Sequence, residues 1–340
     1  MEKERLVYLD QIKGFAIFLM VFAHIIAWSY DDWRLVMHPV DNTQCFINAG
    51  LIWHFVYAFH MALFFMVSGY LTYKPIQGAD SGGGILLAIK KKTTRLLIPY
   101  FVTGGLIMLI RPGFGYWFLF SLWELSIIGV LINWFLATIN KKNNLMIDVF
   151  AVGFLYYFLV KFFSLEILKN PVVDVQYGMT FYLPFMFGIL LRKYPNVEEF
   201  VGKNYSLVVI LFLLCFISKY IVSDYKLIKY VRYVISITHS TEIFGSMTFY
   251  YLFKQGVNVK WGNVLSYLGK HTFEIYILHV FFAVRIVQVG GYWLNTNLPT
   301  CLATQIVYAS CATIVAIAVS LIIASFIKHS KLISKLMFGQ

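Results

Sequence analysis

Long apolar segments without alternation dominate the pattern of hydrophobic and polar positions along the chain. Their lengths lie near the roughly 20 residues that a helix needs to cross the hydrocarbon core of a bilayer. A membrane β-strand would instead alternate apolar and polar residues over about ten positions, and in lipid only helices and closed barrels satisfy their own backbone groups. The pattern therefore predicts an all-α, polytopic transmembrane helix bundle with about ten spans.

The expected spans can be placed along the sequence with boundaries good to a few residues. They are Tyr8–Ser29, Leu51–Tyr73, Leu96–Ile110, Tyr116–Ile139, Leu145–Phe163, Gln176–Leu191, Tyr205–Val222, Tyr233–Phe253, Val264–Val289 and Cys301–Ile327. Pro99 and Pro112 flank the short third span, and at this point the count can change by one.

The distribution of Lys and Arg predicts the orientation of the spans. With ten spans, most basic residues outside the apolar segments fall on the same side as both termini, which are therefore expected in the cytoplasm. These residues are Lys3, Arg5, Lys74, Lys90, Lys91, Lys92, Arg95, Lys141, Lys142, Arg192, Lys193, Lys203, Lys254, Lys260, Lys328, Lys331 and Lys335. One loop disagrees, because Lys226, Lys229 and Arg232 fall on the outer side in this scheme.

The composition is typical of a membrane protein and argues against nucleic-acid binding. Hydrophobic residues make up 60% of the chain and charged residues 13%, whereas soluble domains carry about 25% charged residues. We therefore expect one transmembrane domain over residues 1–340, without a soluble module for nucleic acid. The net charge of +12 is interpreted mainly as a cytoplasmic excess beside anionic lipid headgroups. The alternative is a basic cytoplasmic mouth that attracts an anionic substrate.

The first expected span carries two ionisable side chains, which are costly at membrane depth and commonly line functional cavities. Lys13 lies near its cytoplasmic end and His24 lies past its middle. They are 11 residues apart, or three helical turns, so they share one face with a separation of about 16 Å. A buried neutral imidazole can act as a general base. The alternative is that His24 only bonds to a neighbouring helix while Lys13 extends to the interface.

Ionisable residues in three further spans suggest a polar cavity inside the bundle. They are His54 and His60 in the second span, His239 and Glu242 in the eighth, and Lys270, His271, Glu274, His279 and Arg285 in the ninth. Lys270 and Glu274 are one turn apart and can form an ion pair, and His271 and Glu274 are the alternative contact. Each residue alone is more simply a buried polar group with a partner. The His-x-x-Glu spacing suits a metal site, and His24, His60 and His279 on three helices are a second conceivable ligand set whose distances the sequence does not show. Without a second carboxylate cluster we expect no metal.

Five blocks carry a resemblance that the composition does not reveal. They are LDQIKGFAIFLMVFAHI (9–25), FHMALFFMVSGYL (59–71), KKKTTRLLIPY (90–100), GYWFLFSL (115–122) and LGKHTFEIYILH (268–279). In content and order they resemble the acyltransferase 3 family of integral membrane acyltransferases. Lys13 stands where that family usually has Arg, which keeps the charge but loses the planar bidentate fork. Ala62 stands where Pro is usual.

The resemblance implies a membrane-embedded O-acyltransferase. Such an enzyme takes an acyl group, commonly acetyl, from coenzyme A at the cytoplasmic face. It delivers the group to a hydroxyl of a carbohydrate or lipid-linked glycan at the outer face. The expected partners are therefore acyl-CoA (acetyl-CoA), a glycan acceptor and membrane lipids, with no tightly bound cofactor. The expected location is the bacterial inner membrane.

The resemblance also suggests roles for individual residues. His24 is expected to act as a general base or as a transient acyl carrier, and Glu274 to orient an imidazole. Lys13 and Arg95 are expected to bind or orient the donor, and Trp117 to line the donor or acceptor path. Further candidates for the cavity are His60, His239, Glu242 and His279.

Two other classes of protein suit the same pattern. A transporter or flippase of a glycan or lipid intermediate also has many spans with buried charges. Paired, Gly/Pro-interrupted helices would favour it, and the sequence shows no such pairing. A non-catalytic scaffold of the cell envelope is the third interpretation.

Overall fold

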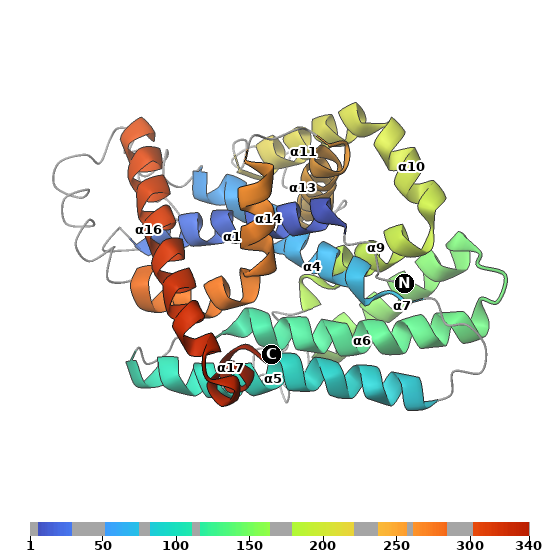
Figure 1. Ribbon diagram of the computed structural model, residues 1–340. Coiled ribbons are helices and arrows are strands. Elements are labelled where there is room, and N and C mark those ends of the chain that lie inside the picture. The colour runs from blue at the N-terminus through green and yellow to red at the C-terminus, as the bar shows by residue number, and fades with distance from the viewer. Residues whose placement is uncertain are drawn as a thin grey trace. The chain divides into compact units, whose positions relative to one another are not determined.

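The protein is described by a computed structural model over residues 6–28, 52–74, 82–110, 116–163, 179–220, 237–256, 261–283 and 302–339. Every regular element in these ranges is a helix (Figure 1), which confirms the all-α prediction. The helices are α1 (Val7–Trp28), α4 (His60–Thr72), α5 (Gly82–Ile110), α6 (Trp117–Ile139), α7 (Leu145–Phe163), α9 (Tyr182–Lys193), α10 (Pro195–Lys203), α11 (Tyr205–Tyr220), α13 (Ile237–Lys254), α14 (Gly262–Lys270), α16 (Leu302–Lys328) and α17 (Lys331–Phe338). Residues 52–57 and Thr272–Ala283 are also helical.

Several of these helices are long and apolar enough to cross a membrane. In the described ranges there are four, Val7–Ala27, Ile52–Thr72, Trp117–Ile139 and Ile306–Lys328. The helices α10 and α11 meet at 77° and make a fifth if they count as one span. The total of ten spans and the cytoplasmic termini stay predictions, since the sixth, eighth and ninth expected spans run partly outside the described residues.

Helix α5 is longer than the sequence suggested. The third span was expected to begin at Leu96, but the helix begins at Gly82. The basic run Lys90–Arg95 is therefore helical, because lysine and arginine are good helix formers and nothing in the run breaks a helix. Pro99 lies within the helix. As a result, the basic side chains point to different sides of one rod.

The ninth expected span, Val264–Val289, is not one uninterrupted helix. In the described residues it divides at His271 into α14 and the helix Thr272–Ala283. The backbone N–H of His271 is shared between the carbonyls of Tyr267 and Leu268, an arrangement common at helix ends. The break changes which side chains on its two sides can meet.

The chain ends in a short helix that the sequence analysis did not predict. The Ser330 hydroxyl accepts a hydrogen bond from the N–H of Ile333 at 3.4 Å and caps the start of α17. Gly339 ends the helix with a φ of 67°, a left-handed conformation that favours glycine. Phe338 is fully buried, and α17 packs on α5. A helix of this length is too short for a search for membrane spans to detect.

The described residues belong to two compact units, which are treated separately. The first is Met1–Leu63 with Ser206–His329, and the second is Phe64–Tyr205 with Ser330–Gln340. The first contains α1, α11, α13, α14, Thr272–Ala283 and α16. The second contains most of α4 and all of α5, α6, α7, α9, α10 and α17.

In the first unit, α1 and α14 cross at very short range (Figure 1). A Cβ atom on Gly14 would lie 1.9 Å from the carbonyl oxygen of Leu265, and one on Gly269 would lie 1.7 Å from that of Asp10. Only glycine permits this approach of the two backbones. The glycines that follow Lys13 and Leu268 in the sequence blocks therefore have a packing role.

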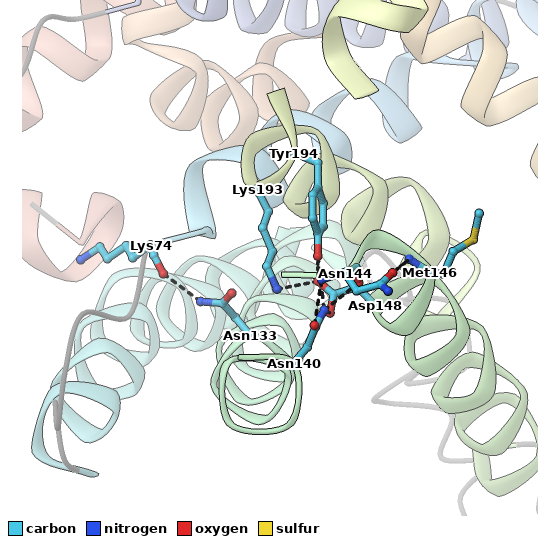
Figure 2. Close-up of polar contacts among 8 residues, drawn as sticks. All are labelled: Lys74, Asn133, Asn140, Asn144, Met146, Asp148, Lys193 and Tyr194. Carbon is cyan, nitrogen blue, oxygen red and sulfur yellow. Dashed lines mark hydrogen bonds and ion pairs between the residues drawn. The ribbon is translucent and has the colours of Figure 1, made fainter. Parts of the chain in front are cut away.

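In the second unit, α5 and α6 lie side by side, and α9 contacts α6, α7 and α10. A polar network joins the end of α6 to α7 and α9 (Figure 2). The fully buried Asp148 carboxylate accepts hydrogen bonds from Asn140 at 2.7 Å, Lys193 at 2.5 Å and Tyr194 at 2.8 Å. Its charge is thus compensated by one cation and two further donors.

Candidate active site

His24 lies on α1, four residues before the helix ends at Trp28. Its Nδ1 atom is 3.0 Å from the Nε2 atom of His279, which lies on Thr272–Ala283. His279 is 1% exposed and His24 is partly buried. The structure therefore joins two of the predicted cavity residues, from the first and last of the five blocks.

His60 is the second fully buried imidazole of the first unit. Its Nδ1 atom donates to the carbonyl of Val56 at 2.8 Å, and its ring packs edge-on against Tyr57. Within the described part of the chain its Nε2 atom has no hydrogen-bond partner. His60 starts α4, directly after a turn at residues 58–59, and its bond to Val56 spans that turn.

Lys13 forms an ion pair with Asp10, with 2.7 Å between Nζ and Oδ1. Both residues belong to the first sequence block, so its Asp-x-x-Lys spacing forms a charge pair along α1. Since α1 is continuous from Val7 to Trp28, Lys13 and His24 share one helix face, as their spacing predicts. Binding of a donor by Lys13 stays a prediction.

Glu274 is buried and pairs with Lys328 at the end of α16. Its Oε1 atom is also 3.5 Å from Nδ1 of His271, which confirms the alternative contact. The expected pair between Glu274 and Lys270 is wrong, because the helix breaks at His271 and Lys270 is exposed. The sequence analysis assigned Lys328 only to the basic tail. Its place as the last residue of the last apolar run was the signal that it could reach a buried carboxylate.

His239 and Glu242 lie side by side on α13, with 3.3 Å between Nδ1 and Oε2. This agrees with their spacing of three residues. Both side chains are mostly buried, with 18% and 13% exposed. Among the described residues, no three His, Cys, Asp or Glu side chains are grouped to hold a metal ion.

The cations of α5, in the second unit, differ in their surroundings. Lys90, Lys91 and Arg95 are exposed, whereas Lys92 is half-buried and donates to the hydroxyl of Thr72 at 3.1 Å. Burial, helped by the charges of Arg95 and Lys74, lowers the pKa of Lys92 to about 8. Lys92 thus lies close enough to Arg95 and Lys74 for their positive charges to repel it, and a nearby negative charge would favour its charged form.

Trp117, at the start of α6, takes part in an aromatic cluster of the second unit. Its ring is nearly parallel to that of Phe181, with centroids 5.9 Å apart. Phe181 in turn stacks on Phe65 at 4.7 Å. A role of Trp117 in lining the donor or acceptor path stays a prediction.

Glu124 is an ionisable residue at membrane depth that the sequence analysis missed. It lies in the candidate span Trp117–Ile139 and is 8% exposed. The rule applied to the other spans would have found it, because a carboxylate within an apolar run is costly without a function or a partner.

Span-length apolar helices with buried ionisable side chains define the chain as an integral membrane protein. The family model described as an acyltransferase domain matches residues 6–115 and 112–325. The chain belongs to the acyltransferase 3 family and is an acyltransferase, a transferase of groups other than amino-acyl groups. Neither the curated proteins nor the solved structures gave a match. The family match confirms the resemblance and favours an enzyme over a transporter or scaffold.

Proposed function

We propose that this acyltransferase moves an acyl group, acetyl by analogy with its family, from acyl-CoA to a hydroxyl of an extracytoplasmic glycan or lipid-linked sugar. The donor would bind on the cytoplasmic side of a bacterial inner membrane, with both termini on that side. The observation that carries the proposal is the His24–His279 contact at 3.0 Å in a chain matched by the family over nearly its whole length.

The reaction needs a base at the acceptor hydroxyl. The oxygen attacks the thioester carbonyl, a C–O bond forms and the C–S bond breaks. The hydroxyl proton is removed and finally reaches the coenzyme A thiolate. His24 is the proposed base, because an imidazole near neutral pH can accept this proton and return it. General base catalysis of this kind contributes about 10²–10⁴-fold to a rate.

Donor binding is assigned to lysine and arginine side chains. Acyl-CoA carries phosphates, which lysine and arginine bind through charge-assisted hydrogen bonds. Lys92, Arg95 and Lys74 form the cationic group of the second unit, and Lys13 is a further candidate on α1. The exposed side chain of Arg95 can form the bidentate contact that lysine cannot.

The proposal is tested by coenzyme A release from purified full-length protein in liposomes supplied with acetyl-CoA and a crude glycan acceptor. Wild type should release coenzyme A and label the acceptor, whereas His24→Ala should lose at least 100-fold of the rate. His329→Ala is the matched control, since His329 is exposed at the end of α16 and should leave the rate unchanged.

Two outcomes would overturn the proposal. If wild type neither binds nor turns over acyl-CoA while the glycan of a deletion strain remains acylated, acyl transfer from coenzyme A fails. If His24→Ala keeps full activity, the enzyme remains an acyltransferase but its base lies elsewhere.

A further inference from the structure

The starting point is the contact between the His279 ring and the backbone of its own helix. Its Nδ1 atom lies 2.8 Å from the carbonyl oxygen of Tyr276 and 3.0 Å from that of Ile275. A carbonyl oxygen can only accept a hydrogen bond, so Nδ1 of His279 must carry the hydrogen. In the neutral ring the lone pair then lies on Nε2.

The neutral form of His279 is the one that the site favours. The residue is 1% exposed, and a hydrogen on both ring nitrogens would bury a full positive charge. The rings of His24 and His279 are 16° from parallel and their centroids are 5.3 Å apart. This separation nearly equals the nitrogen–nitrogen distance plus the two ring radii. The contact therefore lies along the line between the rings, where in-plane N–H bonds and lone pairs point.

We infer that His279 is a positioning residue that holds His24 in its Nδ1–H tautomer, so that Nε2 of His24 carries the lone pair that removes the acceptor proton. The inference rests on the proposed acyl transfer for its catalytic meaning. The assignment follows from one chain of hydrogen bonds, in which His24 donates to His279 and His279 donates to the backbone. The backbone carbonyls thus decide which nitrogen of His24 is basic.

The same chain accounts for the charge that appears during transfer. When Nε2 of His24 takes the hydroxyl proton, the ring becomes an imidazolium whose Nδ1–H already points at His279. A hydrogen bond with a charged donor is roughly twice as strong as a neutral one. The proton then leaves Nε2 for the coenzyme A thiolate, and both rings return to their first state. His279 keeps its single hydrogen throughout.

The protein contains a natural reference for this tautomer. His60 is fully buried and its Nδ1 atom also donates to a carbonyl, that of Val56, at 2.8 Å. Its tautomer is set by the backbone alone and should not respond to changes at His279. If a substitution of His279 changes the nitrogen NMR signals of His24 but not those of His60, its effect is local and the fold is intact.

The experiment reads the tautomers directly, by nitrogen NMR of full-length protein in lipid with ¹⁵N-labelled histidine. His24→Ala, His279→Ala and His60→Ala assign the signals. We expect an Nδ1–H tautomer at His24 with a scalar coupling across the hydrogen bond to Nε2 of His279. In His279→Ala the coupling should vanish and His24 should show a mixture of tautomers, while His60 is unchanged. A hydrogen on Nε2 of His24 in wild type would overturn the inference, whether or not the protein turns over acyl-CoA.

Kinetics supply the second readout. His279→Ala should lower kcat by about 10²-fold or more, within the range that a general base contributes, with the KM for acetyl-CoA unchanged. His279→Gln offers an acceptor oxygen near the position of Nε2 and should recover part of the loss. Equal loss in both variants, or a loss confined to KM, would assign His279 a structural or binding role. If the NMR result holds but wild type shows no turnover, only the proposed function fails.

Discussion

His24 and His279 are 255 positions apart in sequence, yet their imidazole nitrogens lie 3.0 Å apart. The contact joins α1 to the helix Thr272–Ala283 within the first unit. The helix α14 directly precedes Thr272–Ala283 and packs closely on α1 at Gly14 and Gly269. The position of His279 along α1, and hence its distance from His24, therefore depends on how closely these two backbones approach. The packing of the glycines and the chemistry of the histidines are therefore linked.

The close crossing predicts that Gly14→Ala is strongly destabilising. An added Cβ would lie 1.9 Å from the Leu265 carbonyl oxygen, so α1 and α14 must move apart. We expect a loss of several kcal/mol, or failure to accumulate folded protein, as for severe overpacking. Thermal unfolding in detergent and yield after size-exclusion chromatography would measure it.

Two other helical glycines serve as controls for this prediction. A Cβ atom on Gly104 of α5 or Gly153 of α7 would meet nothing within 4 Å. Alanine at either position should leave stability equal or raise it by up to about 1 kcal/mol, because alanine has the higher helix propensity. A Gly14→Ala protein as stable as these controls would contradict the close packing.

The ion pair between Glu274 and Lys328 predicts a second stability effect. Lys328→Met removes the lysine that pairs with the 1%-exposed Glu274. We expect a loss of about 2 kcal/mol, below the 3–5 kcal/mol typical of fully buried pairs, because a third of the Lys328 side chain is exposed. Unfolding in detergent would measure it.

The second substitution in this pair makes the test specific. Glu274→Gln added to Lys328→Met removes the carboxylate charge that the lysine balanced and should restore part of the stability. Lys335→Met, at an exposed position of α17, should have little effect. Equal losses in the single and double variants would show that the Lys328 side chain contributes through packing and not through its charge.

The spacing of residues predicted well what depends on one continuous helix. The pairs His239–Glu242 and His271–Glu274, both with a spacing of three, are in contact, and the all-helical class follows from the apolar runs. The family match also confirms the resemblance that the blocks carried. In each case the information is local, or it is carried by several motifs in a fixed order.

Contacts between helices could not be predicted in the same way. Periodicity gives the face of a helix but not the neighbour of that face, so the distance between His24 and His279 could not be predicted. Glu274 pairs with Lys328 and not with Lys270. The helix breaks at His271, so residues before and after the break no longer follow one helical spacing. The helix α17 is too short to stand out by hydropathy.

The polar network in Figure 2 predicts that Asp148 holds three helices of the second unit together. Asp148→Asn removes the charge that balances Lys193, whose side chain is only 6% exposed. The loss should be about 3 to 5 kcal/mol, as when one partner of a buried pair is removed. Tyr194→Phe removes one hydrogen bond and should cost about 1 kcal/mol. Thermal unfolding of the purified variants would rank them.

An exposed pair provides the control for this ranking. Glu199 and Lys203 lie 2.8 Å apart on α10, with side chains 65% and 73% exposed. Glu199→Gln should therefore leave unfolding unchanged, since exposed ion pairs contribute little. If Asp148→Asn behaves like Glu199→Gln, the network does not stabilise the unit.

The lowered pKa of Lys92 predicts that donor binding weakens in mildly alkaline solution. Burial, Arg95 and Lys74 lower this pKa to about 8, so the charged fraction of Lys92 falls as the pH rises through 8. If only charged Lys92 binds the anionic donor, the KM for acetyl-CoA should rise about tenfold from pH 7 to pH 9. Lys92→Arg keeps its charge over this range and should show a flat KM. A rise of the same size in Lys92→Arg would assign the titration to a different group, and a flat profile in wild type would exclude Lys92 from donor binding.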